Sequence, residues 1–318
     1  MIGLVEGRAE QVVHAGVERP PALGDEGAGG ERVVAGGDHG GGVGAGEAVR
    51  IFTGGAVPPG ADAIVIQENA EAADGLVRFT TAVEAGTFVR AAGLDFPAGW
   101  AGLVAGTWLD GRALGLAAAM GHVWIPVRRR PRIGLLATGN ELRLPGETPV
   151  GSQIISSNTM TVGTMVSGWG AIAVDLGICP DDGAALARRV RDARGLEMLV
   201  TTGGASVGDY DLVQSALEQE GLILDFWKIA MRPGKPVMFG MLGALPILGL
   251  PGNPVSALVT ATLFLRPALQ HMLGKKMADN APAFARLGVA LKANDQRQDY
   301  VRATLSRRAD GSLLAAPF

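Results

Sequence analysis

Short apolar runs alternate with helical patterns along residues 131–273. An acidic start, a basic end and a closing glycine are typical of a helix at 181–195, and Asn158 is expected to cap the helix before it. Strands that alternate with helices form a mostly parallel sheet flanked by helices, so this pattern predicts an α/β fold. We expect strands at 132–137, 171–178, 197–202 and 245–250, and helices at 158–170, 181–195, 211–221 and from 254 to about 273.

The remaining sequence has a different pattern of apolar and polar residues. Residues 47–130 read as a β-rich module, in which short strands are broken by Gly-Pro turns and a short helix and a strand stand near the end. Residues 131–274 form the α/β domain, and residues 275–318 read as a short, truncated-looking β-rich piece. Residues 1–46 contain 14 glycines and no aromatic residue, so we expect them to be disordered or not to be the native start.

Composition narrows the class of partner. The 318 residues carry 28 basic and 31 acidic side chains, a net charge of −3, and only 5% are aromatic, which argues against a nucleic-acid partner. The longest apolar stretch, 255–265, is too short to span a membrane. Cys179 is the single cysteine, which suits the reducing cytoplasm, and it is expected to be a small buried hydrophobic residue. The four histidines show no metal-ligand spacing, and nothing indicates covalent catalysis.

Three loops in the second half carry the candidate chemistry: TTGGASVGDYD at 201–211, RPGKP at 232–236 and LPGNP at 250–254. Glycine lets the backbone approach a ligand closely, and a Gly-rich turn between strand and helix directs free N–H groups outward, where an anion can bind. In open α/β sheets, ligands bind beyond the carboxyl ends of the strands. The loops therefore predict a site for a phosphorylated or oxyanionic ligand.

Each loop also has a plainer interpretation. The glycine loop lacks the spacing of a Walker or dinucleotide site and can be a tight turn capped by an aspartate. Arg232 could bind an oxyanion with its forked guanidinium and Lys235 could attract one as a point charge. Both side chains can equally be exposed to solvent with no ligand. Asn253 can cap the following helix with Pro254 in its first turn, a role compatible with anion binding.

Three carboxylates follow predicted strands. Glu141, Asp181 and Asp211 are each explained most simply as helix caps or loop residues. If they converge at one edge of the sheet, they suit Mg²⁺ held between carboxylates and substrate phosphates. Convergence is a property that the sequence does not reveal.

Five strings occur here in the order of one family: IFTGGAVPPGADAIV, ATGNEL, TTGGASVGDYD, FWKIAMRPGKP and GLPGNPVSA. Together they closely resemble the MoeA-type molybdopterin molybdenumtransferases, the family that includes the gephyrin E domain. The resemblance implies insertion of molybdenum from molybdate into adenylylated molybdopterin with release of AMP, assisted by Mg²⁺. It also implies an elongated homodimer with a cleft between the α/β domain of one subunit and the β-rich domain of the other, and contacts with other cofactor-biosynthesis proteins.

The resemblance also implies site residues. Asp181 and Asp211 would organise Mg²⁺, Arg232 and Lys235 would attract molybdate or phosphate, and Glu141 would position the pterin or a water. A second group would bind the substrate, with the glycines and the serine around its phosphate: Thr53, Asp95, Gly203, Gly204, Ser206, Pro251, Asn253 and Pro254.

Some features depart from the family. The family pattern is expected to begin only at Gly46, without the Asp-Gly-Tyr-Ala segment that usually precedes the β-rich module, and Asn140 stands where aspartate is common. Two alternatives stay open on these grounds. One is a molybdopterin adenylyltransferase, which shares a related α/β domain, and the other is a catalytically weak molybdopterin-binding scaffold.

Overall fold

The computed structural model describes residues 10–15, 26–33, 41–73, 76–193, 195–204, 212–275 and 284–318. The chain divides into two compact units, Met1–Gly102 and Leu103–Phe318. The predicted boundary at 130 thus differs from the observed division at 102. The segment before the α/β domain belongs with that domain, because residues 103–109, 125–128 and 130 share a cavity with its helix ends.

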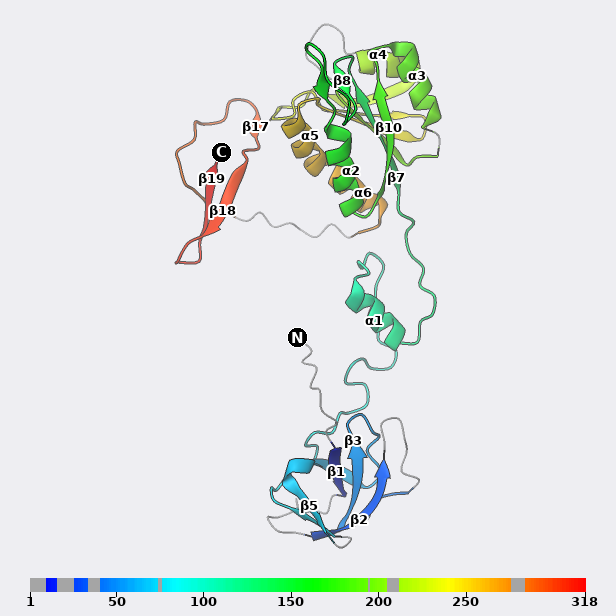
Figure 1. Ribbon diagram of the computed structural model, residues 1–318, viewed down its shortest axis with the longest axis vertical. Coiled ribbons are helices and arrows are strands. Elements are labelled where there is room, and N and C mark those ends of the chain that lie inside the picture. Colours follow the sequence, from blue (N-terminus) through cyan, green and yellow to red (C-terminus); the bar gives the residue numbers. More distant parts are fainter. Residues whose placement is uncertain are drawn as a thin grey trace. The chain divides into compact units, whose positions relative to one another are not determined.

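The first unit is built on a six-stranded sheet with the order β4-β1-β3-β2-β6-β5 (Figure 1). Along β3, Val49 and Ile51 pack into one apolar cluster while Ala48 packs into another. This alternation is the two-residue period of a strand buried on both faces. The strands of this sheet are β1 Glu10–Ala15, β2 Glu26–Val33, β3 Glu47–Phe52, β4 Ala61–Ile66, β5 Ala70–Ala73 and β6 Leu76–Phe79, with the short helix η1 Gln67–Asn69 between β4 and β5.

The first 46 residues require a correction. Within the described ranges they form β1 and β2, which flank β3 in antiparallel and parallel register respectively. The expectation of disorder is wrong for these two ranges. Both ranges pair with β3 through the main chain, and their glycine-rich surroundings gave no hydrophobic period that would mark them as strands.

Two further expectations about the β-rich module are wrong. Strands were expected at 87–96 and after the short helix, but the segments 80–102 and 121–131 contain none. In the first segment Gly86, Gly93 and Gly99 all have positive φ, and repeated turns of this kind prevent an extended ladder. The predicted helix is present as α1, Gly111–Ala119, where the carboxylate of Asp110 accepts from the Ala113 N–H at 2.9 Å.

The second unit contains a six-stranded sheet with the order β10-β7-β11-β15-β14-β12. The first four strands are parallel, and β14 and β12 extend the sheet through antiparallel pairs. The predicted α/β class is therefore confirmed. The strands are β7 Arg132–Thr138, β10 Ile172–Cys179, β11 Met198–Thr202, β12 Leu222–Trp227, β14 Met238–Leu242 and β15 Leu245–Leu250.

Helices cover both faces of this sheet, as Figure 1 shows. One apolar layer joins the sheet to α2 and to the α5–α6 segment, and a second layer joins it to α3 and α4. The helix predicted after Pro254 is observed as α5, a π-helical turn and α6. The bounds are α2 Asn158–Gly168, α3 Gly183–Asp192, α4 Leu212–Gln219, α5 Pro254–Thr260, η2 Ala261–Leu265 and α6 Arg266–Met272.

Short strands complete the second unit. β13, Met231–Arg232, pairs in parallel with β17, Gln298–Asp299, so the C-terminal segment contacts a loop of the α/β domain. A small sheet has the order β16-β19-β18. The bounds of the remaining strands are β8 Leu142–Arg143, β9 Ile154–Ile155, β16 Arg286–Leu287, β18 Ala303–Arg307 and β19 Leu313–Pro317. Among the described helices, none has the length and apolarity needed to cross a membrane.

Candidate functional site

The described candidate residues of the second unit gather along the carboxyl edge of its sheet. Asp181 follows β10, Glu141 follows β7, Gly203 follows β11 and Pro251 follows β15. The loop at 228–237 joins the same edge, because Trp227 pairs with Met238 and Met238 pairs with Gly249 near the end of β15. Neighbouring strands are about 4.8 Å apart, so the four steps from β10 to β14 place these loops along a row about 19 Å long.

Asp181 is held by its neighbour across the edge. Its carboxylate Oδ2 accepts from the Asn140 N–H at 3.1 Å, and its own N–H donates to Asn140 Oδ1 at 3.1 Å. The helix cap at this position is Asp182, whose carboxylate accepts from the Ala185 N–H at 2.6 Å. The capping interpretation of Asp181 is therefore wrong, and its second carboxylate oxygen is in no hydrogen bond within the described residues.

Glu141 lies beside the same turn. A Cβ atom built on Gly139 would stand 2.5 Å from a Glu141 carboxylate oxygen, so this side chain folds back over the end of β7. Arg143 fastens the loop by donating to the carbonyls of Asn140 and Leu142, at 3.2 Å and 2.6 Å. The carboxylate of Glu141 is thereby kept at the edge of the sheet and exposed to solvent.

The glycine turn after β11 is required by packing. Gly203 has a φ of 95° and a built Cβ would lie 2.4 Å from the Thr138 carbonyl oxygen. Gly204 has a φ of 66° and its Cβ would lie 2.1 Å from Val213 in α4. The Gly203 N–H already donates to the Leu250 carbonyl at 3.2 Å, so this amide is not available to an anion.

Three buried threonine hydroxyls stand at the same edge. Thr138 at the end of β7, and Thr201 and Thr202 at the end of β11, are at most 3% exposed, and their Oγ1 atoms have no hydrogen-bond partner among the described residues. A buried hydroxyl without a partner costs free energy, so three at one edge need an explanation. Sequence reasoning missed them because threonine at the end of a strand is ordinary. Their signal was their place inside the ATGNEL and TTGG strings.

Arg232 is engaged by a carboxylate. Its Nε and Nη2 donate to Asp299 at 3.0 Å and 2.6 Å, and this bidentate pair joins β13 to β17. The hydrogen bond to Asp299 and its charge raise the pKa of Arg232 above its ordinary value. The guanidinium of Arg232, which was expected to bind an oxyanion, is therefore already bound by Asp299. The sequence could not reveal this partner because Asp299 lies 67 residues further along the chain.

Lys235 borders a cavity of about 610 Å³ beside this loop. Its side chain is exposed and forms no ion pair within the described part of the chain. Sequence reasoning did not single out the other two cations at this cavity. Lys228 stacks over Trp227 at 3.5 Å, and Arg297 pairs with Asp295, which lowers the pKa of Asp295 to about 2. The full lining comprises Lys228, Ile229, Ala230, Lys235, Asp295, Gln296 and Arg297.

The LPGNP loop behaves as the plainer interpretation predicted. Asn253 Oδ1 accepts from the Val255 and Ser256 N–H groups at 3.1 Å and 3.2 Å, with Pro254 in the first turn of α5. Asn158 does not cap α2 as expected. It begins α2 after Ser157, and its Nδ2 donates to the Gly252 carbonyl at 2.8 Å, which ties this loop to the helix.

The remaining predicted residues lie in the first unit or outside the described residues. Thr53 follows β3 and Asp95 lies in a turn, and both belong to the first unit. Ser206 and Asp211 lie outside the described residues. Across the described ranges, no group of three or more His, Cys, Asp or Glu side chains could hold a metal ion. A Mg²⁺ site would thus have to be completed from Asp181 with substrate oxygens, or with Asp211.

Cys179 ends β10 directly below this edge. It is fully buried, and burial raises the pKa of its thiol above the ordinary value. The expectation of a small buried hydrophobic residue is confirmed, because a thiol of this kind has little thiolate character.

Two family models match the chain. The MoeA N-terminal region (domains I and II) matches residues 11–121, and a probable molybdopterin binding domain matches residues 134–271. The first match begins 35 residues before Gly46, so the expectation that the family pattern starts only there is wrong.

Relatives and solved structures agree with these matches. The molybdopterin molybdenumtransferase of Haemophilus influenzae is 35% identical over 80% of this chain and 64% of its own length. Molybdopterin molybdenumtransferase 2 of Mycobacterium tuberculosis is 35% identical over 82% of this chain and 66% of its own length. A molybdopterin biosynthesis MoeA protein from Pyrococcus horikoshii has a TM-score of 0.75 at 27% identity, covering 98% of this chain and 78% of that one. The chain belongs to the MoeA family, and it spans just under two thirds of these two curated relatives.

Proposed function

We propose that this protein is a molybdopterin molybdenumtransferase, which inserts molybdenum from molybdate into adenylylated molybdopterin and releases AMP. The observation that carries the proposal is the row of loops along one edge of the sheet. That row, about 19 Å long, suits an extended ligand with a pterin at one end and a nucleotide at the other. The named activity of the two curated relatives supports the same reaction.

The described side chains suggest a division of roles. Lys235, free of any ion pair in the described part, would attract molybdate or a phosphate as a point charge. The buried hydroxyls of Thr138 and Thr202 would gain their missing partners from substrate oxygens near the Gly203–Gly204 turn. Glu141, on the next loop along the edge, would position the pterin or a water.

Arg232 takes a different role in this proposal from the one its sequence suggested. Because Asp299 occupies its guanidinium, Arg232 would hold β17 against the loop rather than bind an oxyanion. That pairing brings the Arg297–Asp295 ion pair to the cavity beside Lys235, so Lys235 would be the cation that meets an oxyanion there. Pro251, Asn253 and Pro254 would shape the loop at the middle of the row.

Mg²⁺ would be held by Asp181 and Asp211 together with substrate oxygens, which fits a cation that usually takes one or two carboxylates and keeps waters. When bound, Mg²⁺ would neutralise charge on the phosphates. Ser206 with Gly204 would line the phosphate, and Thr53 and Asp95 would also bind the substrate. We further propose a cytoplasmic homodimer that meets other enzymes of cofactor synthesis.

The test gives the purified full chain adenylylated molybdopterin and molybdate, with and without Mg²⁺, and measures AMP and active cofactor. Molybdate-dependent AMP release is the expected result. Lys235→Met should raise the molybdate concentration needed for half-maximal rate about tenfold or more, because one charged contact is lost. Lys292→Met, at an exposed lysine that does not line the cavity beside Lys235, serves as the matched control.

Other outcomes would overturn the proposal. Conversion of ATP and free molybdopterin to the adenylate would indicate an adenylyltransferase. Tight substrate binding without turnover would indicate a scaffold. Equal effects of the two lysine variants would remove Lys235 from the site even if turnover is seen.

A further inference from the structure

We propose a second ligand site in the α/β unit, at the opposite edge of the sheet, that takes a small organic anion with an apolar body. It is a cavity of about 910 Å³ beside the amino ends of β7 and β10. β7 has seven residues, so its two ends are about 20 Å apart and this cavity is separate from the carboxyl edge. The lining comes from residues 103–109, 125–128, 130, 167–168, 170 and 273–275.

The size and lining of the cavity fit a small molecule. Ligand pockets hold roughly 300–1,000 Å³ and are mainly apolar, with a few polar groups that fix orientation. Here Leu103, Trp108, Leu109, Ile125 and Leu273 supply apolar surface. The charged lining residues among those described are all cations, Arg128, Arg130 and Lys275, so the cavity is complementary to an anion.

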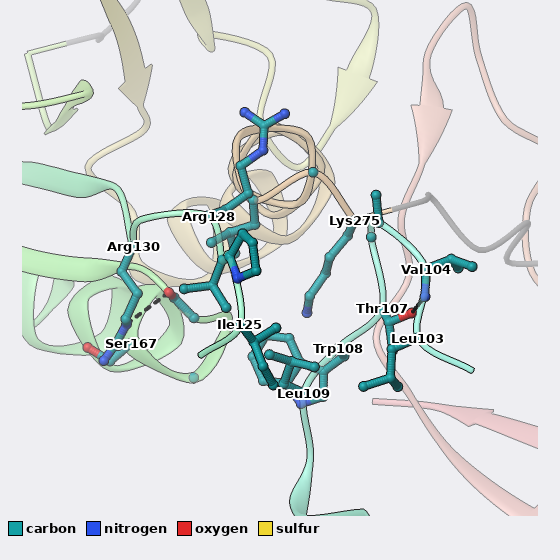
Figure 2. Close-up of a pocket in the computed structure, with 18 residues that line it drawn as sticks. Leu103, Val104, Thr107, Trp108, Leu109, Ile125, Arg128, Arg130, Ser167 and Lys275 are labelled. Carbon is teal, nitrogen blue, oxygen red and sulfur yellow. Dashed lines mark hydrogen bonds between the residues drawn. The ribbon is translucent and has the colours of Figure 1, made fainter. Parts of the chain in front are cut away.

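Lys275 provides the charge for this ligand. Its Nζ lies 3.7 Å from the centre of the Trp108 ring, and Figure 2 shows the side chain extending toward that ring. Burial, and then the charge of Arg266, lower the pKa of Lys275 from its ordinary value. The ammonium group is thus partly removed from water with an aromatic face as its partner and no carboxylate in the described structure, and an anion would supply the missing counter-charge.

The two arginines act differently. Arg130 donates from Nε to the Gly170 carbonyl at 3.0 Å and from Nη2 to the Ala171 carbonyl at 2.7 Å, so its guanidinium holds the turn after α2. Arg128 packs over Gly274, and in Figure 2 its guanidinium points away from Trp108. Lys275 is therefore the cation directed at the apolar part of the cavity, and an apolar body stacked near Trp108 would place its anionic group there.

Two fluorescent probes of similar shape separate charge from apolar contact. The full chain is titrated with 8-anilinonaphthalene-1-sulfonate, an anion, and with the uncharged N-phenyl-1-naphthylamine. We expect one saturable site that favours the anion. Lys275→Met keeps most of the side-chain stem and should weaken binding of the sulfonate about tenfold while leaving the neutral probe within about twofold. Lys292→Met should change neither.

A second pair of variants tests the location. Gly168 lines the cavity at the end of α2, and a Cβ atom there meets nothing within 4 Å. Gly168→Leu should therefore fold and should weaken both probes by filling the cavity. Gly115→Leu adds the same side chain to α1, where a Cβ also meets nothing within 4 Å, and should weaken neither.

The proposal fails on any of three results. If Lys275→Met weakens binding of both probes equally, or leaves binding of the sulfonate unaffected, Lys275 only packs against Trp108 and does not bind the anion. Sulfonate binding unchanged by Gly168→Leu would place the probe elsewhere. Thermal unfolding of each variant shows that a loss of binding is not a loss of fold. Because these readouts need no molybdopterin or molybdate, they are independent of the proposed activity.

Discussion

The two edges of the sheet in the α/β unit are built in different ways. At the carboxyl edge the backbone sets the shape: Gly203 and Gly204 pack against Thr138 and Val213, and Gly252 approaches Gly203 so closely that a Cβ there would lie 3.3 Å from the Gly203 Cα. At the amino edge, long side chains such as Trp108 and Lys275 surround an open cavity. Substitutions at the carboxyl edge must therefore fit a closely packed backbone. At the amino edge, a single side chain can be replaced without moving the backbone.

The glycines provide the strongest contrast between the edges. Gly204→Ala should lower the free energy of unfolding by roughly 2–5 kcal/mol, because its φ is 66° and its Cβ would overlap Val213. Gly168→Ala at the amino edge should change it by less than about 1 kcal/mol, since nothing opposes its Cβ and alanine favours a helix. Denaturant unfolding of the two variants measures the difference. Equal stabilities would show that the turn at Gly204 relaxes freely.

Glu197 accepts hydrogen bonds that hold the amino edge of the sheet. Its Oε2 accepts from the Arg132 N–H at 2.5 Å, and its Oε1 pairs with Arg129. Burial alone would raise the pKa of Glu197, but these hydrogen bonds outweigh burial and lower it. Glu197→Gln should cost about 1–2 kcal/mol at pH 7, where the native carboxylate is charged.

The pH dependence of that cost follows from the lowered pKa. A carboxylate with a lowered folded pKa stabilises fully above its unfolded value of about 4.3, and the stabilisation is lost as the pH falls through the folded pKa. The gap between native protein and Glu197→Gln should therefore close in acid. Asp225→Asn, at an exposed position in the same sheet, is the control, and a gap that stays constant down to about pH 2 would contradict the assignment.

The Arg232–Asp299 pair sharpens the comparison at the carboxyl edge. The Arg232 side chain is 50% exposed and that of Asp299 is 17% exposed, so their coupling should be only about 0.5–1 kcal/mol in a double-mutant cycle with Arg232→Met and Asp299→Asn. If Arg232 binds the oxyanion directly, Asp299→Asn should tighten molybdate binding by freeing the guanidinium. If Arg232 only positions β17, Asp299→Asn should weaken molybdate binding or leave it unchanged.

The sequence was most informative where local and overall patterns agree. The alternation along residues 131–273 predicted the parallel strands and their helices because buried strands and amphipathic helices have different periods. It was least informative in residues 26–33, where β2 pairs with β3 and β6 although the sequence shows no strand pattern. Hydrophobic periodicity along one segment does not show which neighbouring strands that segment will pair with.

The same division holds for the candidate site. The glycine and proline strings alone located the loops, because turns with positive φ and tight backbone approach demand those residues. Only the tertiary structure decided that Asp182 rather than Asp181 caps α3, that Asn158 binds the Gly252 carbonyl, and that Arg232 is held by Asp299. Each of these polar side chains can reach several partners, and the packing of distant segments decides which partner it contacts. The sequence thus determined where the chain turns, while folding decided what each charge faces.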